Sequence, residues 1–286
     1  MKYPTVLTKL VFLLGNPLGH SLSPAMHNRV FEKMELDYCY LPVETVPENL
    51  ETVFNGLRHM NMAGCNVTIP HKIKIIDFLD KLDPLASAIG AVNTIRMVDG
   101  KTIGYNTDGE GFLRSLAGKT QGGIEDKNFF LMGCGGAGRA IAITLAQHGA
   151  AGIFICNRTP AKAEALAAEI NTSIRHCSKA LDRATTDILH NCQVLINSTS
   201  VGMHPDSDAL PLDDSLILPH LTVADIVYNP LTTRLLEIAK KRGCTVVHGL
   251  GMLVHQGAAA FKLWTGVEAD MQEMSTTVSN IFKKEQ

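Results

Sequence analysis

Six residues near the middle of the chain have the spacing of a phosphate-binding turn: Gly133-Cys134-Gly135-Gly136-Ala137-Gly138. A predicted strand over 127–132 comes directly before them, and a helical pattern over 139–148 follows. In this setting the first glycine allows a tight turn, the second lets a pyrophosphate approach the backbone, and the third lets helix and strand pack closely. The helix N-terminus then attracts phosphate. The pattern predicts a dinucleotide site; the alternative is a glycine-rich turn without a ligand.

The tip of the next predicted strand indicates which dinucleotide. That strand ends in Asn157-Arg158-Thr159-Pro160, where an NAD-binding chain would carry an acidic residue for the ribose 2′-hydroxyl. The Arg158 guanidinium suits a 2′-phosphate, and Lys162 adds a second positive charge. An ordinary helix cap followed by proline would explain Thr159 and Pro160 but not Arg158. The sequence therefore predicts NADP rather than NAD.

Small polar residues stand beside two predicted element ends in the first third of the chain. Ser21 and Ser23 precede a helix that begins with Pro24. In an extended segment, residues two apart face the same side, so the two hydroxyls could together bind a carboxylate at the helix start. Asn66 and Thr68 repeat this spacing after a strand. The alternatives are that Ser23 only caps its helix and that Asn66 and Thr68 only shape a turn.

Lys72 is unusual in its predicted surroundings. A helix predicted over His71–Leu82 would place it on the same face as four apolar residues, which are Ile75, Ile76, Leu79 and Leu82. A lysine on an inward face needs a reason, because lysine is rarely buried. Lys72 is thus a candidate for chemistry, and the alternative is that its side chain extends to solvent from the first turn.

Asp108 and Gln256 are two further candidates. Asp108 lies at the start of a predicted helix, where a first-turn acid is also favoured by the helix dipole alone. Gln256 shares a helical face with apolar residues, which are Met252, Ala259, Ala260 and Leu263. A buried amide must find hydrogen-bond partners, so Gln256 faces either a ligand or a backbone group.

Alternating strand and helix patterns must position these residues. In the first third we expect strands at Val11–Leu14, Tyr38–Val43, Ala63–Val67, Ala91–Val98 and Thr102–Tyr105, and helices at Pro24–Met34, Pro47–Met60, His71–Leu82 and Pro84–Ile89. In the middle we expect parallel strands at Phe129–Met132, Gly152–Cys156, Val194–Asn197, Val223–Val227 and Thr245–Val247. Gly118–Asp126 is predicted to be a linker, and the chain after His248 is predicted to be helical. The pattern predicts two α/β domains, with C-terminal helices that could return to the first.

Composition excludes several classes of protein. The 286 residues carry a formal charge of −2, so no electrostatic footprint for nucleic acid or an anionic membrane is present. No apolar run approaches the roughly 20 residues of a membrane span. The seven cysteines form no C-x-x-C pair, and the eleven histidines form no metal-binding motif. We expect a reduced, cytoplasmic protein without a metal.

Eight motifs, taken together and in order, resemble the shikimate dehydrogenase family from about Phe12 to Gly266. They are Ser21–Asn28, Asn66–Lys72, Gly90–Thr94, Asn106–Gly109, the glycine loop, Asn157–Thr159, Asn197–Met203 and Gly249–Gln256. The resemblance implies an α/β substrate domain formed by residues 1–107 and completed by helices over 249–286. It also implies a Rossmann-type NADP-binding domain with a parallel sheet over 108–248, with catalysis in the cleft between the two.

The resemblance also implies a role for each nominated residue. Ser21 and Ser23 would hold the substrate carboxylate, and Lys72 and Asp108 would form the catalytic pair. The ring hydroxyls would be bound by Asn66, Thr68, Asn93 and Gln256, with Tyr228 bordering the same pocket. The cofactor would be lined by Gly133, Cys134, Gly135, Gly136, Ala137, Asn157, Arg158, Thr159, Lys162, Ile226 and Gly249. An arginine is frequent in the family where this chain has Lys162, which would weaken the grip on the 2′-phosphate.

The implied activity is the NADP-dependent, reversible reduction of 3-dehydroshikimate to shikimate in the chorismate pathway of aromatic amino-acid biosynthesis, by a cytoplasmic monomer or homodimer. The nearest alternative is an enzyme that uses both quinate and shikimate, a branch that the stretch Val227–Leu231 also resembles. A catalytically silent NADP sensor is disfavoured by the presence of Lys72 and Asp108. A dehydrogenase for a folate or another small carbon acid is disfavoured by the paired serines.

Overall fold

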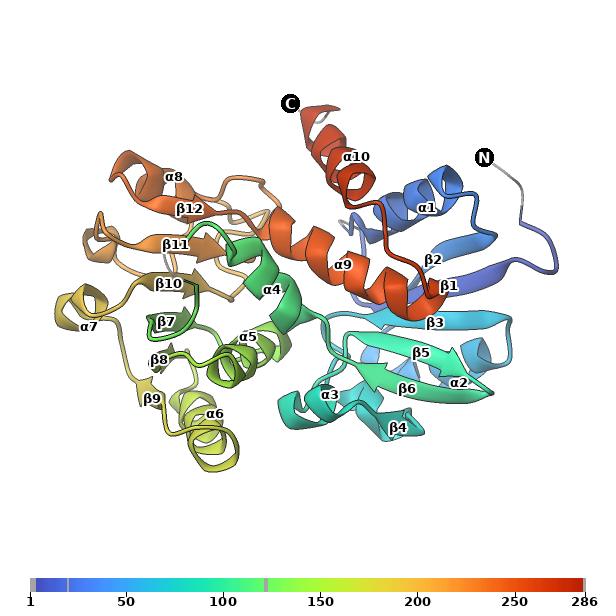
Figure 1. The fold of residues 1–286 in the computed structure, drawn as a ribbon, viewed down its shortest axis with the longest axis horizontal. Helices are drawn as coiled ribbons and strands as arrows, with labels where there is room; N and C mark the ends of the chain where they lie inside the picture. Colours follow the sequence, from blue (N-terminus) through green and yellow to red (C-terminus); the bar gives the residue numbers. More distant parts are fainter. Residues whose placement is uncertain (1–3, 20, 121–122, 285–286) are drawn as a thin grey trace. The chain divides into compact units, whose positions relative to one another are not determined.

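The computed structural model describes residues 4–19, 21–120 and 123–284. The chain divides into two compact units, one formed by Met1–Thr107 with Val254–Gln286 and the other by Asp108–Leu253 (Figure 1). The first division falls between Thr107 and Asp108. The second lies inside helix α9 (Gly249–Thr265), not at residue 248, so the first turn of that helix belongs to the second unit.

The first unit is built on a mixed six-stranded sheet in the order β2-β1-β3-β5-β6-β4. Its strands are β1 (Lys9–Gly15), β2 (Tyr38–Glu44), β3 (Met62–Val67), β4 (Lys81–Leu82), β5 (Thr94–Val98) and β6 (Lys101–Tyr105). Strands β2, β1 and β3 are parallel, whereas β5 is antiparallel to both β3 and β6. The polar residues after β3 and before β5 therefore lie at the same end of this sheet.

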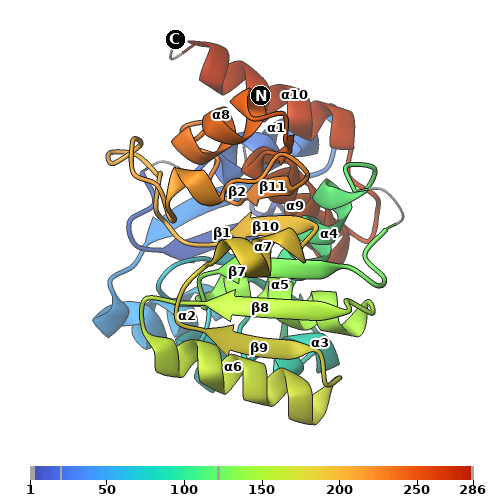
Figure 2. The ribbon, with the colours of Figure 1, turned by 90° about the vertical axis from the view of Figure 1, so that its left-hand side faces the viewer.

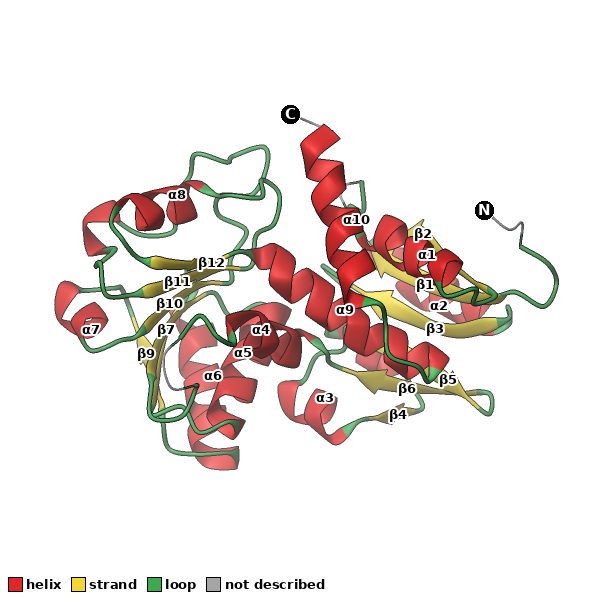
Figure 3. Cartoon of the chain, turned by 45° about the horizontal axis from the view of Figure 1, so that its top comes forward, coloured by secondary structure: helices red, strands yellow, loops and turns green. Residues whose placement is uncertain are grey.

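Helices cover both faces of this sheet (Figures 1 and 3). One face, with Phe12 and Leu14, packs on α2 (Leu50–Arg58) and the 3₁₀ turn η2 (Lys74–Phe78). The other face is covered by α1 (Ser23–Lys33) and the C-terminal part of α9. The remaining elements are the 3₁₀ turn η1 (Pro47–Asn49), α3 (Pro84–Ile89) and α10 (Met271–Lys284).

The helix predicted over His71–Leu82 is wrong. The segment forms a turn at Lys72, the 3₁₀ turn η2 and then the short strand β4. The carbonyl of Lys72 accepts the backbone N–H of Val92 at 2.8 Å, and the N–H of Ile76 bonds to Ile73 at 3.2 Å. Since a tertiary contact uses a carbonyl that an α-helix would need, the local pattern gives way to a tighter turn. The helical face on which Lys72 was nominated is therefore not formed.

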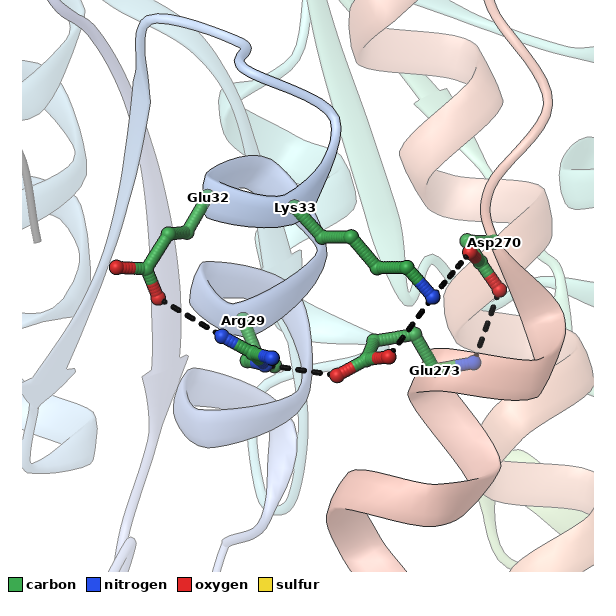
Figure 4. A network of polar contacts seen from close by, with 5 residues as sticks. All are labelled: Arg29, Glu32, Lys33, Asp270 and Glu273. Carbon is green, nitrogen blue, oxygen red and sulfur yellow. Dashed lines mark hydrogen bonds and ion pairs between the residues drawn. The ribbon is translucent and has the colours of Figure 1, made fainter.

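The C-terminal helices return to the first unit, as expected. The indole Nε1 of Trp264 donates to the carbonyl of Ile95 at 2.9 Å. A Cβ on Gly64 would lie 2.4 Å from the same indole ring, so only glycine permits this approach. Ion pairs join α1 to the start of α10: Arg29 binds Glu273 in α10 at 2.7 Å, and Lys33 binds Asp270, the residue before α10, at 2.8 Å (Figure 4).

The second unit contains a fully parallel sheet in the order β12-β11-β10-β7-β8-β9; Figure 2 shows β11, β10, β7, β8 and β9 side by side. The strands are β7 (Asn128–Met132), β8 (Gly152–Cys156), β9 (Ser178–Leu181), β10 (Val194–Asn197), β11 (Thr222–Asp225) and β12 (Thr245–Val247). Numbered within this unit, the order is 3-2-1-4-5-6 read from the β9 edge, which is that of the Rossmann fold. The expected fold class is confirmed.

Helices cover both faces of the second sheet. These are α4 (Asp108–Leu116), α5 (Gly136–Gln147), α6 (Pro160–Ser173), α7 (Thr186–His190), α8 (Arg234–Lys241) and the 3₁₀ turn η3 (Asp214–Leu216). Residues of α7 and α8 pack with Phe130 and Leu195 on one face. Strand β9 was not predicted, and β11 ends two residues before its predicted end. The predicted linker Gly118–Asp126, of which residues 121–122 lie outside the described part of the chain, falls within Asp108–Leu253 and so is not the boundary between the two units.

Candidate functional site

The glycine loop connects β7 to α5 and has the geometry that its spacing predicted. Gly133 has φ +102°, a conformation that residues with a Cβ rarely adopt. A Cβ on Gly138 would lie 2.3 Å from the carbonyl oxygen of Gly133, so helix and loop touch there. At Gly135, the N-cap of α5, a Cβ would meet no described heavy atom within 4 Å. Gly135 therefore faces open space at the N-terminus of α5.

Ser198 supports this loop from the neighbouring strand. It follows β10, and its Oγ is placed to bond the carbonyls of Met132 at 2.7 Å and Gly133 at 3.1 Å. Strands β7 and β10 are adjacent at the point where the strand order reverses, the usual ligand position in such sheets. Ser198 lies in the Asn197–Met203 motif but was not among the residues nominated from the sequence.

Asn157 ties the loop to the tip of β8. Its Oδ1 accepts the backbone N–H of Cys134 at 3.1 Å, and its Nδ2 donates to the carbonyl of Thr159 at 2.9 Å. The Cys134 amide is thus used inside the protein. Thr159 occupies the N-cap position of α6 without a side-chain cap bond, which removes the capping explanation for its hydroxyl.

Arg158 and Lys162 are exposed at the start of α6. Together with the open N-terminus of α5, they supply backbone N–H groups for a pyrophosphate and permanent positive charge for a further phosphate. This donor set fits a dinucleotide that carries a 2′-phosphate.

A buried carboxylate organises the segment after β11. Asp225 accepts hydrogen bonds from Asn197 Nδ2 at 3.0 Å, the N–H of Val227 at 3.0 Å and Thr233 Oγ1 at 2.7 Å. Burial raises the pKa of Asp225 to about 6, and the three donors oppose that rise. None of these side chains was nominated from the sequence.

Two nominated cofactor residues meet beside this carboxylate. A Cβ on Gly249, the first residue of α9, would lie 2.4 Å from the carbonyl oxygen of Ile226, the residue after β11. Helix α9 therefore starts in direct contact with the backbone that follows β11. Tyr228, nominated for the substrate, is half-buried in the same unit, and burial raises the pKa of its phenol.

In the first unit, Ser21 and Ser23 lie together for a different reason from the one predicted. Leu22 between them is in the right-handed helical region, so the segment is a turn and not extended. The turn brings the N–H of Ser23 to 3.4 Å from Ser21 Oγ. Helix α1 begins at Ser23 itself, with Leu22 as N-cap and no side-chain cap bond, so Ser23 does not serve as the cap.

The nominated amides of the first unit form one hydrogen-bonded network. Asn66 Nδ2 donates to the carbonyl of Asn93 at 3.0 Å and to Thr94 Oγ1 at 3.1 Å. Asn93 Nδ2 lies 2.9 Å from Thr107 Oγ1 and 3.4 Å from Gln256 Oε1. The network joins three strand ends to α9, and one partner of the Gln256 amide in it is the side chain of Asn93.

The two proposed catalytic residues occupy different units. Lys72 is partly exposed in its turn, and Asp108 is 4% exposed as the first residue of α4. The backbone of Lys72 is fixed to Val92, next to Asn93, and Asn93 Oδ1 accepts the N–H of Thr107 at 2.8 Å. Thr107 directly precedes Asp108. Two consecutive residues just before β5 therefore make these bonds: Val92 binds the backbone of Lys72, and Asn93 binds the backbone of Thr107.

Thr68 lies just after β3, where its N–H donates to the carbonyl of Leu14 at 2.8 Å. In the part of the chain that the structure describes, no group of three or more metal-binding side chains occurs. Within the same residues, no helix has the length and apolar character needed to span a membrane.

Models of known families match three parts of the chain. Residues 13–95 match "Shikimate dehydrogenase substrate binding domain", residues 115–204 match "Shikimate / quinate 5-dehydrogenase", and residues 249–278 match "Shikimate 5'-dehydrogenase C-terminal domain". The matches fall on both units and include most of the motifs described above.

Individual relatives cover nearly the whole chain. The shikimate dehydrogenase (NADP(+)) of Methanocaldococcus jannaschii is 44% identical over 280 residues, which are 97% of this chain and 98% of that protein. The crystal structure of shikimate 5-dehydrogenase from Thermus thermophilus with NADP(H) and shikimate has a TM-score of 0.86 at 37% identity, covering 95% of this chain and 99% of that one. Ligand-free 5-ketofructose reductase of a Gluconobacter strain has a TM-score of 0.87 at 37% identity, covering 96% and 99%. On this evidence, the chain belongs to the shikimate dehydrogenase family.

Proposed function

We propose that this protein is an NADP-dependent shikimate dehydrogenase that catalyses the reversible reduction of 3-dehydroshikimate to shikimate in the chorismate pathway. The observation that carries the proposal is the polar network of the first unit, in which Asn66, Asn93 and Gln256 are joined by hydrogen bonds. A ring with several hydroxyls needs such a set of fixed amides. We propose that Ser21, in the turn before α1, and Ser23, the first residue of α1, bind its carboxylate at the start of that helix.

The proposed chemistry assigns proton transfer to Lys72. When bound, the reduced cofactor supplies the hydride that adds to the substrate carbonyl carbon. Lys72 Nζ then gives a proton to the carbonyl oxygen as it becomes an alcohol, and takes it back in the oxidation direction. Asp108 would hold the ammonium in position through its opposite charge. The shared attachment of the Lys72 backbone and of Thr107 to residues 92 and 93 supports this pairing.

Cofactor choice follows from the tip of β8. Arg158 and Lys162 are exposed there, and no carboxylate occupies the position that would bind a ribose 2′-hydroxyl. We therefore propose NADP as the working cofactor. All seven cysteines are free thiols, which fits a reducing cytoplasmic compartment. Cell fractionation tests this proposed location.

The direct test measures the absorbance of the reduced cofactor as it forms. Each of NADP+ and NAD+ is combined in turn with shikimate, with quinate and with the alcohol that forms when 5-ketofructose is reduced. We expect the largest kcat/KM for shikimate with NADP+. A larger value for quinate would support the dual-substrate alternative, to which the family description "Shikimate / quinate 5-dehydrogenase" also points. Absence of turnover with all of these substrates, in a protein that binds NADP+, would replace the proposal by a silent NADP-binding module.

A further inference from the structure

Tyr40, which no sequence argument nominated, contacts one of the proposed substrate-binding residues. It lies in β2, is 1% exposed, and donates its hydroxyl hydrogen to Asn66 Oδ1 at 2.9 Å. Asn66 belongs to β3, two strands away in the sheet order, so this bond crosses over β1. A buried tyrosine hydroxyl needs a partner, and here the partner is the amide proposed to meet the substrate.

The remaining contacts of Asn66 determine what it can offer to a ligand. Both hydrogens of Nδ2 are used, one on the carbonyl of Asn93 and one on Thr94 Oγ1. The amide oxygen has two lone pairs, and Tyr40 uses one of them. Asn66 can therefore meet a substrate hydroxyl only as an acceptor. A reversed amide would place Oδ1 against the carbonyl oxygen of Asn93, so the arrangement has one orientation.

Tyr40 is itself held on two sides. The ring of His27 stacks on its ring with centroids 4.7 Å apart and an interplanar angle of 13°. Asn28 accepts the N–H of Tyr40 at 2.8 Å and donates to its carbonyl at 2.9 Å, as a neighbouring strand would. Helix α1, which begins with Ser23, thus fixes both the backbone and the ring of Tyr40.

We propose that Tyr40 is a positioning residue: its hydroxyl fixes the amide of Asn66 so that Oδ1 accepts a hydrogen bond from one ring hydroxyl of the substrate. The inference rests on the proposed function and adds to it a direction for that hydrogen bond. The substrate donates, and Asn66 accepts.

The first experiment compares Tyr40→Phe with Tyr38→Phe. Tyr38 lies in the same strand and donates its hydroxyl hydrogen to the carbonyl of Trp264 at 3.2 Å, so each substitution removes a hydroxyl that donates a hydrogen bond. We expect Tyr40→Phe to raise KM for shikimate about 5- to 15-fold, the effect of one lost buried hydrogen bond, with KM for NADP+ unchanged. Tyr38→Phe should keep both KM values. Equal effects of the two variants on shikimate KM would overturn the inference.

The second experiment uses shikimate analogues in which one ring hydroxyl is replaced by hydrogen or by fluorine, which cannot donate. In the wild-type protein, one ring position should show the same loss with fluorine as with hydrogen, and at that position Tyr40→Phe should cause no further loss. If fluorine restores binding at every position, Asn66 is not an acceptor and the inference fails, even if Tyr40→Phe does not fold. A wild-type protein without any shikimate turnover would instead overturn the proposed function. The two experiments therefore distinguish failure of the Tyr40 inference from failure of the proposed function.

Discussion

Asn93 Oδ1 accepts a hydrogen bond from the backbone N–H of Thr107 at 2.8 Å. This bond joins the residue before β5 to the residue before α4. The preceding residue, Val92, donates its N–H to the carbonyl of Lys72. Both contacts to the proposed catalytic region use backbone atoms of Lys72 and Thr107. Side-chain chemistry at position 72 can therefore be changed without removing the bond that holds its turn.

Lys72→Ala tests the proposed proton transfer. The substitution keeps the backbone bond to Val92 and removes the ammonium, so we expect kcat to fall about a hundred- to ten-thousand-fold. The Kd for NADP+, measured by fluorescence titration, should stay unchanged. Lys74→Ala is the matched control, because Lys74 lies two residues away, is exposed and pairs with Asp77. A Lys72→Ala variant with kcat near that of Lys74→Ala would exclude the assigned role.

Arg158→Ala tests the preference for the 2′-phosphate. Loss of a charge-assisted bond should lower kcat/KM for NADPH about 10- to 100-fold and leave the value for NADH nearly unaltered. Arg234→Ala serves as control, since Arg234 is exposed on α8 of the same unit and pairs with Glu237. The ratio of the two kcat/KM values is the measurement. If both cofactors lose equally, Arg158 does not read the 2′-phosphate.

Gly64→Ala tests the return of the C-terminal helix to the first unit. The added Cβ would lie 2.2 Å from the carbonyl oxygen of Ile95 and 2.4 Å from Trp264. Overpacking of this kind costs about 1–3 kcal/mol, so we expect a lower free energy of unfolding. Gly56→Ala in α2, where a Cβ meets nothing described within 4 Å, should be neutral or stabilise by up to about 1 kcal/mol. Denaturation followed by the fluorescence of Trp264, the single tryptophan, reports on this unit. Equal midpoints for the two variants would contradict the packing described.

His27 makes the stability of the first unit depend on pH. Its ring is fully buried, neither nitrogen has a described hydrogen-bond partner, and burial lowers its pKa from 6.5 to about 3. The unfolded state therefore binds a proton that the folded state does not, so the contribution of neutral His27 is complete above pH 6.5. It is lost as the pH falls toward 3, with a slope of roughly 1.4 kcal/mol per pH unit.

His27→Phe removes this titration and keeps an aromatic ring. We expect the free energy of unfolding, again followed by Trp264 fluorescence, to depend less steeply on pH between about 4 and 6 than in the wild type. The comparison uses slopes, so any steric cost of the larger ring does not affect it. His59→Phe, at an exposed position of the same unit, should keep the wild-type slope. Identical slopes for His27→Phe and the wild type would show that His27 is charged or solvated in the folded state.

The sequence by itself determined features that depend on local chemistry. The spacing of Gly133, Gly135 and Gly138 predicts the turn that the structure contains, in which Gly133 adopts a positive φ and a Cβ on Gly138 would meet the carbonyl oxygen of Gly133. The alternation of short apolar runs with helical patterns gave the two α/β units and the return of the C-terminal helices. The absence of an acid after β8 was likewise visible without coordinates.

Only the tertiary structure decided the partners of each polar group. Local periodicity predicted a helix around Lys72, but a backbone bond to Val92, twenty residues away, replaced it with a tighter turn. The contacts of Tyr40 with Asn66 and of Asp225 with Thr233 join side chains whose neighbourhood depends on strand order and on turns. A buried polar group must find a hydrogen-bond partner, and the fold decides which group lies within reach. Residue spacing along the chain does not say which group that is.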